Sequence, residues 1–303
     1  MPRLIDPGDG EAIGLDAFMG ALDSCPLDLR DEDALASLGP LLARLGRNRT
    51  FLADRAIDDL KARCGGQAAN AYGAQVMMLR PADGRTVLRA NFWPAADDAV
   101  LRASGPAAFF YGFAHDHNFP FLTVGYLGPG YWSDYYDYDG DRVVGLPGEK
   151  AGLRFVERSR LEEGKLLLYR ARRDVHVQHP PDRFSVSLNI LVYDLAQPWR
   201  TQFAFDVAGD TILRPLTTTP SEALVTLAGH LGGGNGRDLI EHLARRHPHP
   251  RMRATAIDAC ASAAPDRAGR AAIYATACDD PDPHVAGIAA ARLRAIAALE
   301  QAP

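Results

Sequence analysis

The chain has 303 residues, of which 47% are hydrophobic and 23% are charged, as in an ordinary folded protein. Its formal charge of −5 is spread along the sequence, so we expect no nucleic-acid partner. No stretch approaches the unbroken apolar run that a membrane span needs, and the N-terminal MPRLIDPGDGEAIG lacks the apolar segment of a secretory signal. We therefore expect a cytoplasmic protein with no membrane partner.

Residues 1–66 are predicted to form an N-terminal helical segment. They are rich in Ala, Leu, Asp and Arg, and apolar residues such as Leu38, Leu41 and Leu45 recur at helical spacing. Two consecutive glycines, the second of which is Gly66, end this pattern.

Residues 67–216 are predicted to form a β domain. Here short β-branched and aromatic runs alternate with Gly, Pro and Asp, which are turn-forming residues. The candidate strands are, in chain order, AQVMML, TVLRANFW, AFFYGFAH, FLTVGYL, YWSDYYDY, LRFVERSRL, KLLLYRA, VHVQ, FSVSLNILVY and RTQFAFDV. Many short strands without helices between them favour a sandwich or a barrel.

Residues 220–303 are predicted to form a second helical unit. HPHPRMRATAIDA and DPDPHVAGIAAAR, which begin at residues 247 and 280, share a Pro-x-Pro start and an alanine-rich continuation at a spacing of 33 residues. A repeat of this length, with proline in the first turn of a helix, is similar to HEAT-type helical hairpins. Two copies are too few for a long solenoid, so the helices either pack on the β domain or bind a peptide or protein.

Two histidines two residues apart, His115 and His117, lie in the segment GFAHDHNFPF on a predicted strand. Alternation along a strand puts both imidazoles on one face and Asp116 on the other, and two such imidazoles can share a divalent ion. His176, on a later strand with Gln178 beside it on the same face, supplies a third imidazole if the sheet closes into a barrel. The alternative is that these histidines are exposed or are hydrogen-bonded in the core.

The residues of this segment resemble the cupin superfamily, and within it the thiol dioxygenases similar to cysteine dioxygenase. The resemblance covers roughly residues 85–195. It rests on four features, namely HDH at 115–117, the histidine and prolines at 176–181, SVSL at 185–188, and Arg89 upstream. It implies a mainly β fold, a cupin barrel (double-stranded β-helix or jelly roll), here with N-terminal helices and a C-terminal HEAT-like helical segment.

The resemblance also implies a metal centre and a substrate contact. His115, His117 and His176 would hold iron(II) and leave positions open for dioxygen and for a chelating substrate. Arg89 corresponds to the arginine that grips the substrate carboxylate in the family, and the alternative for it is a surface position on its strand.

The sequence departs from the family after the last metal ligand. A serine, a histidine and a tyrosine alternate there in thiol dioxygenases, whereas this chain has Ser187, Asn189 and Leu191. No cysteine lies in the cupin-like segment, so a cysteine–tyrosine crosslink within it is excluded. Gln178 or Asn189 would either donate a hydrogen bond to bound oxygen or fix a histidine ring. The missing tyrosine hydroxyl has candidate replacements in Tyr126, Tyr131, Tyr135, Tyr136 and Tyr193.

These observations predict a non-haem iron(II)-dependent oxygenase, a dioxygenase-like oxidoreductase that acts with O2 on a small carboxylate-bearing substrate such as an amino acid or a thiol derivative. Three neutral imidazoles leave the ion its full charge, which favours anionic ligands, and the paired donors of Arg89 match a second anionic group. One alternative is another cupin metalloenzyme, an isomerase, lyase or hydrolase with zinc, nickel or manganese. The other is a non-catalytic cupin binding module with a protein-docking helical tail.

Overall fold

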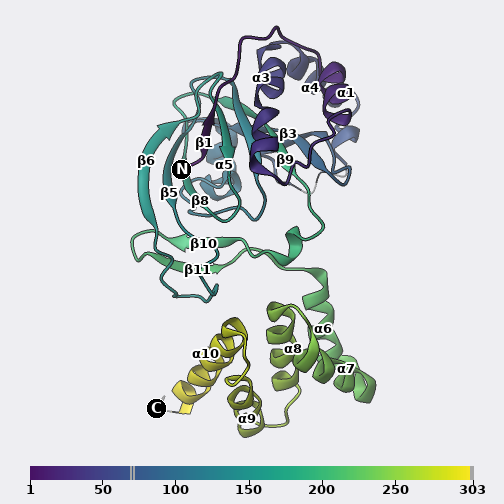
Figure 1. Cartoon of the computed structure of the whole chain (residues 1–303), viewed down its shortest axis with the longest axis vertical. Helices are drawn as coiled ribbons and strands as arrows, with labels where there is room; N and C mark the ends of the chain where they lie inside the picture. Colours follow the sequence, from purple (N-terminus) through teal and green to yellow (C-terminus); the bar gives the residue numbers. More distant parts are fainter. Residues whose placement is uncertain (69, 71, 301–303) are drawn as a thin grey trace. The chain divides into compact units, whose positions relative to one another are not determined.

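The computed structural model describes residues 1–68, 70 and 72–300 (Figure 1). The chain divides into two compact units, each assembled from more than one segment. The first consists of Met1–Gly140, Ala151–Gln197 and Ala204–Asp210, and the second of Asp141–Lys150, Pro198–Phe203 and Thr211–Pro303.

Antiparallel sheets dominate the first unit, as expected from the short β-branched and aromatic runs. One sheet has six strands in the order β1-β7-β4-β9-β3-β2, and another has three in the order β6-β5-β8. The strands of the chain are β1 (Arg3–Ile5), β2 (Val76–Arg80), β3 (Thr86–Trp93), β4 (Phe121–Leu127), β5 (Trp132–Asp137), β6 (Arg154–Arg160), β7 (Leu166–Tyr169), β8 (Asp174–His179), β9 (Ser185–Val192), β10 (Phe203–Asp206) and β11 (Thr211–Pro215). That the sheets form a cupin barrel stays a prediction.

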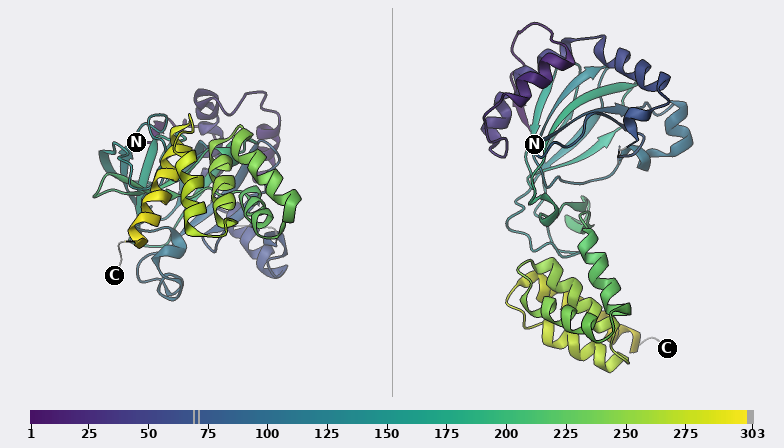
Figure 2. Two further views of the ribbon diagram at one scale, coloured as in Figure 1. Left: turned by 90° about the horizontal axis from the view of Figure 1, so that it is seen from below. Right: turned by 90° about the vertical axis from the view of Figure 1, so that its right-hand side faces the viewer.

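The N-terminal helices cover one face of the six-stranded sheet, as Figure 2 shows for the purple and blue helices. They are α1 (Leu15–Asp23), α2 (Glu32–Ser37), α3 (Gly39–Arg47) and α4 (Phe51–Lys61). Their buried side chains, among them Phe18 and Leu42, pack against every second residue of the strands, such as Leu122 and Leu188. Each large apolar side chain buried in this way contributes roughly 1.5–3 kcal/mol to stability.

The opposite face of the same sheet looks toward the three-stranded sheet. Phe121, Tyr169 and Leu191 lie on this face, one residue out of phase with those under the helices, and they share a cluster with Tyr135 of β5. The space between the two sheets is therefore a second core, and it contains the polar residues described below.

The segment AFFYGFAH, predicted as a strand, is irregular instead. Pro106–Phe109 forms the short 3-10 helix η2, and Phe110 and Gly112 follow with φ angles of 58° and 70°. A strand requires negative φ, so the chain cannot continue as one through these residues. Other short helices are η1 (Gly65–Gln67), α5 (Ala99–Ser104) and η3 (Gln197–Trp199).

The second unit contains the C-terminal helices. They are α6 (Pro220–Leu231), α7 (Gly233–Arg246), α8 (Pro250–Ser262), α9 (Arg267–Ala277) and α10 (Pro283–Glu300). Three of them begin at a proline, whose fixed φ suits the first helical turn. The tail is thus helical, while its kinship to HEAT repeats stays a prediction. Within the described part of the chain, every helix is too short or too polar to cross a membrane.

Candidate metal centre

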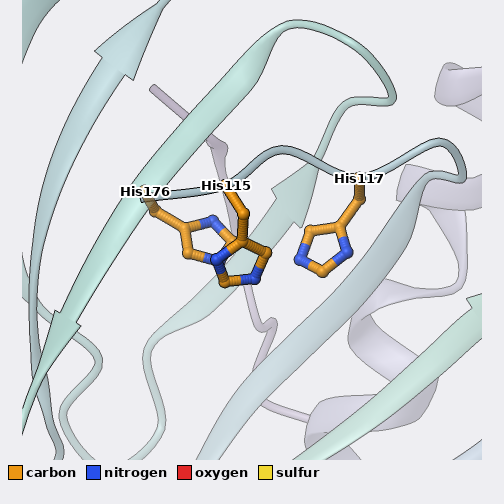
Figure 3. A group of neighbouring side chains, drawn as sticks. All are labelled: His115, His117 and His176. Atoms are coloured by element: carbon orange, nitrogen blue, oxygen red, sulfur yellow. The ribbon is translucent and has the colours of Figure 1, made fainter. Parts of the chain in front are cut away.

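Three histidines from two separate segments come together between the sheets of the first unit. His115 and His117 lie in the irregular segment before β4, and His176 lies in the middle of β8. One ring nitrogen from each lies within 4.8 Å of the others, and Figure 3 shows the imidazoles gathered beside one another. The structure therefore brings together the residues that the sequence predicts as metal ligands.

Backbone hydrogen bonds hold the irregular segment against β8. The N–H of His176 donates to the carbonyl of His115 at 3.0 Å, and the N–H of His115 donates back at 3.2 Å. Farther along, the N–H of Arg172 donates to the carbonyl of His117 at 2.8 Å. These contacts impose a strand-like alternation, so that Asp116 points away from the imidazoles and accepts a hydrogen bond from the Tyr138 hydroxyl.

Burial keeps the imidazoles neutral. His115 and His176 are 4% and 0% exposed, and His117 is half-buried. Loss of hydration lowers the pKa of His115 to about 4. It also lowers the pKa values of His117 and His176 well below the usual value, with a further contribution from the neighbouring histidines. Neutral imidazole is the form that binds a metal ion.

The hydrogen bonds of the rings indicate which nitrogens face a ligand. Nδ1 of His115 lies 2.9 Å from the carbonyl oxygen of Phe113, which can only accept, so Nδ1 donates and the lone pair resides on Nε2. Both ring nitrogens of His176 and Nδ1 of His117 are buried without a hydrogen-bond partner among the described residues. Buried polar atoms are nearly always paired, and a metal ion would bind one nitrogen of each ring. The donor set therefore fits a divalent ion such as iron, zinc, copper or nickel.

Arg89 of β3 supplies a positive charge beside the histidines. Its guanidinium carbon lies 4.6 Å from the centre of the Tyr72 ring, and its Nε is buried without a hydrogen-bond partner in the described chain. Its charge lowers the pKa of His117, after the larger effects of burial and of His115. Arg89 therefore adds positive charge to the surroundings of His117.

The other three predicted site residues have different surroundings. Asn189 of β9 is paired in register with Arg89, and Gln178 follows His176 by two residues on the same face of β8. Both are buried. The Oγ of Ser187, by contrast, already has a partner, because it accepts a hydrogen bond from Nε1 of Trp93 at 3.0 Å.

A buried tyrosine cluster beside the histidines includes one residue that the sequence did not single out. The ring of Tyr169 lies 5.0 Å from that of His176, and its hydroxyl oxygen is 2.9 Å from that of Tyr135. Tyr131 lies in the same buried cluster as Tyr169. Burial raises the pKa values of Tyr131 and Tyr169 well above normal and that of Tyr135 to about 12, so all three stay protonated.

Of the five tyrosines considered for the missing hydroxyl, Tyr131 and Tyr135 enter this cluster. Tyr126 packs under the helices on the other face of the sheet, and Tyr136 faces Phe155 of β6. The face on which Tyr169 lies could have been predicted from the strand KLLLYRA, because alternation along this strand places Tyr169 on the same face as Leu167.

No family model and no curated protein sequence matches the chain. Among solved structures, one of DMSP lyases is 13% identical, covers 36% of this chain and 38% of its own, and has a TM-score of 0.21. A DMSP lyase from Ruegeria pomeroyi DSS-3 is 13% identical over 64% of this chain and 78% of that chain, with a TM-score of 0.25. A cupin domain from Bordetella pertussis Tohama I is 14% identical over 41% of this chain and 96% of that chain, with a TM-score of 0.24.

The chain thus spans well under half of the first of these structures and most of the other two. Cupin-domain proteins are among the matches. Because all three TM-scores are low, the functional assignment rests on the site alone.

Proposed function

We propose that the protein is a cupin metalloenzyme, a non-haem iron(II)-dependent oxygenase that oxidises a small carboxylate-bearing substrate with O2. The observation that carries the proposal is the convergence of three neutral imidazoles, two buried and one half-buried, with one nitrogen of each ring within 4.8 Å of the others. When bound there, iron(II) would supply the activation of dioxygen, which side chains alone cannot perform. Three protein ligands leave coordination positions for the reactants.

In this proposal, charge selects the substrate. The three ligands are neutral, so the ion would keep its full charge, and Arg89 adds another positive charge nearby. An acid with one group on the metal and a carboxylate on the guanidinium would interact favourably with both positive charges, because the paired N–H donors of arginine match a carboxylate. An amino acid or a thiol derivative meets this requirement.

Aromatic side chains would exclude water from the reacting atoms. The ring of Phe121 is 4.9 Å from that of His117 and stacks on Tyr169 at 4.4 Å. The hydroxyl of Tyr169 remains protonated because burial raises its pKa, so it can donate but not lose its proton at neutral pH. Such a donor stabilises negative charge that develops on a bound reactant.

Metal content and oxygen uptake test the proposal directly. We would purify wild type and His176→Ala without oxygen, measure iron by elemental analysis, and record oxygen consumption after adding iron(II) and candidate amino acids. Stoichiometric iron in the wild type, its loss in His176→Ala and substrate-dependent oxygen uptake would support an oxygenase. His242 of α7 is exposed and offers a matched control, since His242→Ala should change neither the iron content nor the oxygen uptake.

Two other outcomes would change the proposal. Bound metal with no oxygen uptake, and turnover with zinc, nickel or manganese, would favour a lyase, isomerase or hydrolase in which the ion acts as a Lewis acid. Equal metal in wild type and His176→Ala would exclude the three-histidine site.

A further inference from the structure

A row of polar side chains crosses the six-stranded sheet on the face that looks toward the three-stranded sheet, which contains His176. Thr123 of β4, Asn189 of β9 and Arg89 of β3 are neighbours in register, and we call these three residues the polar row. Thr123 and Asn189 are 0% and 4% exposed. They share a face with Phe121 and Leu191, which belong to the core between the sheets.

Each residue of the polar row has a buried atom with no hydrogen-bond partner in residues 1–68, 70 and 72–300. The atoms are Oγ1 of Thr123, Nδ2 of Asn189 and Nε of Arg89. On the facing sheet, Oε1 of Gln178 is likewise buried and unpaired within the described chain. Gln178 is two residues from His176, so its amide lies on the same face as the proposed metal ligand.

Unpaired buried groups of this kind are unfavourable unless a ligand pairs with them. A buried donor or acceptor without a partner destabilises a fold by about 1–3 kcal/mol. The next row of the same sheet, Phe121, Leu191 and Val87, is apolar, so this core readily accepts apolar side chains. Four unpaired groups beside a metal site therefore indicate a polar ligand rather than a packing requirement.

The four side chains define the chemistry of that ligand. Arg89 only donates hydrogen bonds, which suits an anion. The hydroxyl of Thr123 and the amides of Asn189 and Gln178 each offer both a donor and an acceptor. We infer that the substrate is an organic acid with, besides its anionic groups, a hydroxyl or amide group that Thr123, Asn189 and Gln178 recognise. This inference rests on the proposed binding of a small anion beside the metal.

A stability measurement tests the inference without any ligand. Thr123→Val replaces the hydroxyl by a methyl group of similar shape, and because the hydroxyl has no partner the metal-free variant should melt a few degrees higher. The matched variant Ser187→Ala should melt lower, since the Ser187 hydroxyl accepts a hydrogen bond from Trp93. A Tm for Thr123→Val that falls as far as that for Ser187→Ala would overturn the inference.

A binding measurement tests the recognition itself. With zinc in the site to prevent redox chemistry, we would titrate malate and methylsuccinate by calorimetry, because these dianions differ by a hydroxyl in place of a methyl group. We expect malate to bind about tenfold more tightly, and the preference to fall at least severalfold in Thr123→Val and Asn189→Leu.

Malate could also gain affinity by chelating the metal through its hydroxyl. Chelation would give a preference for malate that does not depend on Thr123 or Asn189. A preference that is unchanged in both variants, equal affinities in the wild type, or no binding of either acid would overturn the inference. The metal content of each sample, measured in parallel, tests the proposed function separately. A sample that holds zinc but does not distinguish the two acids contradicts the recognition and leaves the metal site intact.

Discussion

His115 and His176 are joined by a reciprocal pair of backbone hydrogen bonds, 3.0 and 3.2 Å long. Their imidazoles also contact each other, with ring centres 4.5 Å apart. The two ligands thus come from segments about sixty residues apart in the sequence, and the backbones of these segments pair directly at the two histidines. The backbone, rather than the metal, fixes the relative position of these two side chains.

This arrangement predicts that single histidine substitutions abolish metal binding without unfolding the protein. In His115→Gln or His176→Gln the backbone pairing remains, while a ligand is lost, so metal affinity should fall by more than about 100-fold. Competition with a chromophoric chelator measures the affinity, and circular dichroism reports the fold. Variants that lost both metal and secondary structure would show that the histidines are needed for folding itself.

The lowered histidine pKa values predict that the metal-free protein loses stability as the pH falls. The folded-state pKa of His115 is about 4, below the value of about 6.5 in an unfolded chain, so the unfolded state binds more protons in between. His115 alone should remove about 2 kcal/mol of stability between about pH 7 and about pH 5. His117 and His176 act in the same direction, because burial lowers their pKa values too.

Urea unfolding of the metal-free protein at the two pH values gives the measurement. His115→Gln has no group that titrates in this range at that position, so the difference in unfolding free energy between the two pH values should shrink by about 2 kcal/mol. An identical difference in wild type and His115→Gln would mean that the imidazole is accessible to protons in the folded state.

The strands could be predicted from the sequence where alternation is regular. TVLRANFW and FLTVGYL correspond residue for residue to β3 and β4, because one face packs under helices and the other faces the second sheet. The histidine cluster followed from the spacing of His115 and His117 together with one later strand. Here local pattern and tertiary environment require the same residues.

The irregular segment before His115 and the neighbours of Thr123 and Tyr169 in the fold could not be predicted, because they depend on backbone conformation and tertiary contacts that no local sequence pattern contains. The segment before His115 looks like a strand in composition, yet Pro106 and the positive φ of Phe110 bend it into a loop. In the sequence Thr123 looks like any other strand residue. Only the register of β4 and β9 shows that it lies beside Asn189. The place of Tyr169 beside the histidines likewise follows only from tertiary contacts, namely those with His176 of β8 and with the hydroxyl of Tyr135 of β5.

Tyr169→Phe should destabilise the first unit without loss of metal. The substitution keeps the ring against His176 but removes the hydroxyl that is hydrogen-bonded to Tyr135. Leaving the buried hydroxyl of Tyr135 without that partner costs about 1–3 kcal/mol. Urea unfolding measures the change, and Tyr136→Phe, whose ring faces Phe155 outside the cluster, should stay within about 0.5 kcal/mol of wild type. Equal unfolding free energies for Tyr169→Phe and Tyr136→Phe would show that the hydrogen bonding of the tyrosine cluster does not contribute to stability.

The second unit has a buried ion pair whose loss should leave the metal site unaffected. Nε of Arg251 lies 2.8 Å from Oε1 of Glu222, both side chains are about nine-tenths buried, and the guanidinium also donates to the carbonyl of Pro198 at 2.7 Å. In Arg251→Met the carboxylate of Glu222 stays buried without its cation, which costs about 3–5 kcal/mol. All three histidines belong to the other unit.

Thermal unfolding followed by calorimetry, with metal content measured in parallel, tests this prediction. Arg251→Met should lower the transition of the helical unit and keep the full metal content. The double variant Arg251→Met/Glu222→Leu should recover most of the stability, because no charge is then left buried. Arg245→Met removes an exposed pair with Glu241 and should change stability by less than about 1 kcal/mol. Loss of metal in Arg251→Met would mean that the helical unit is required to maintain the histidine cluster.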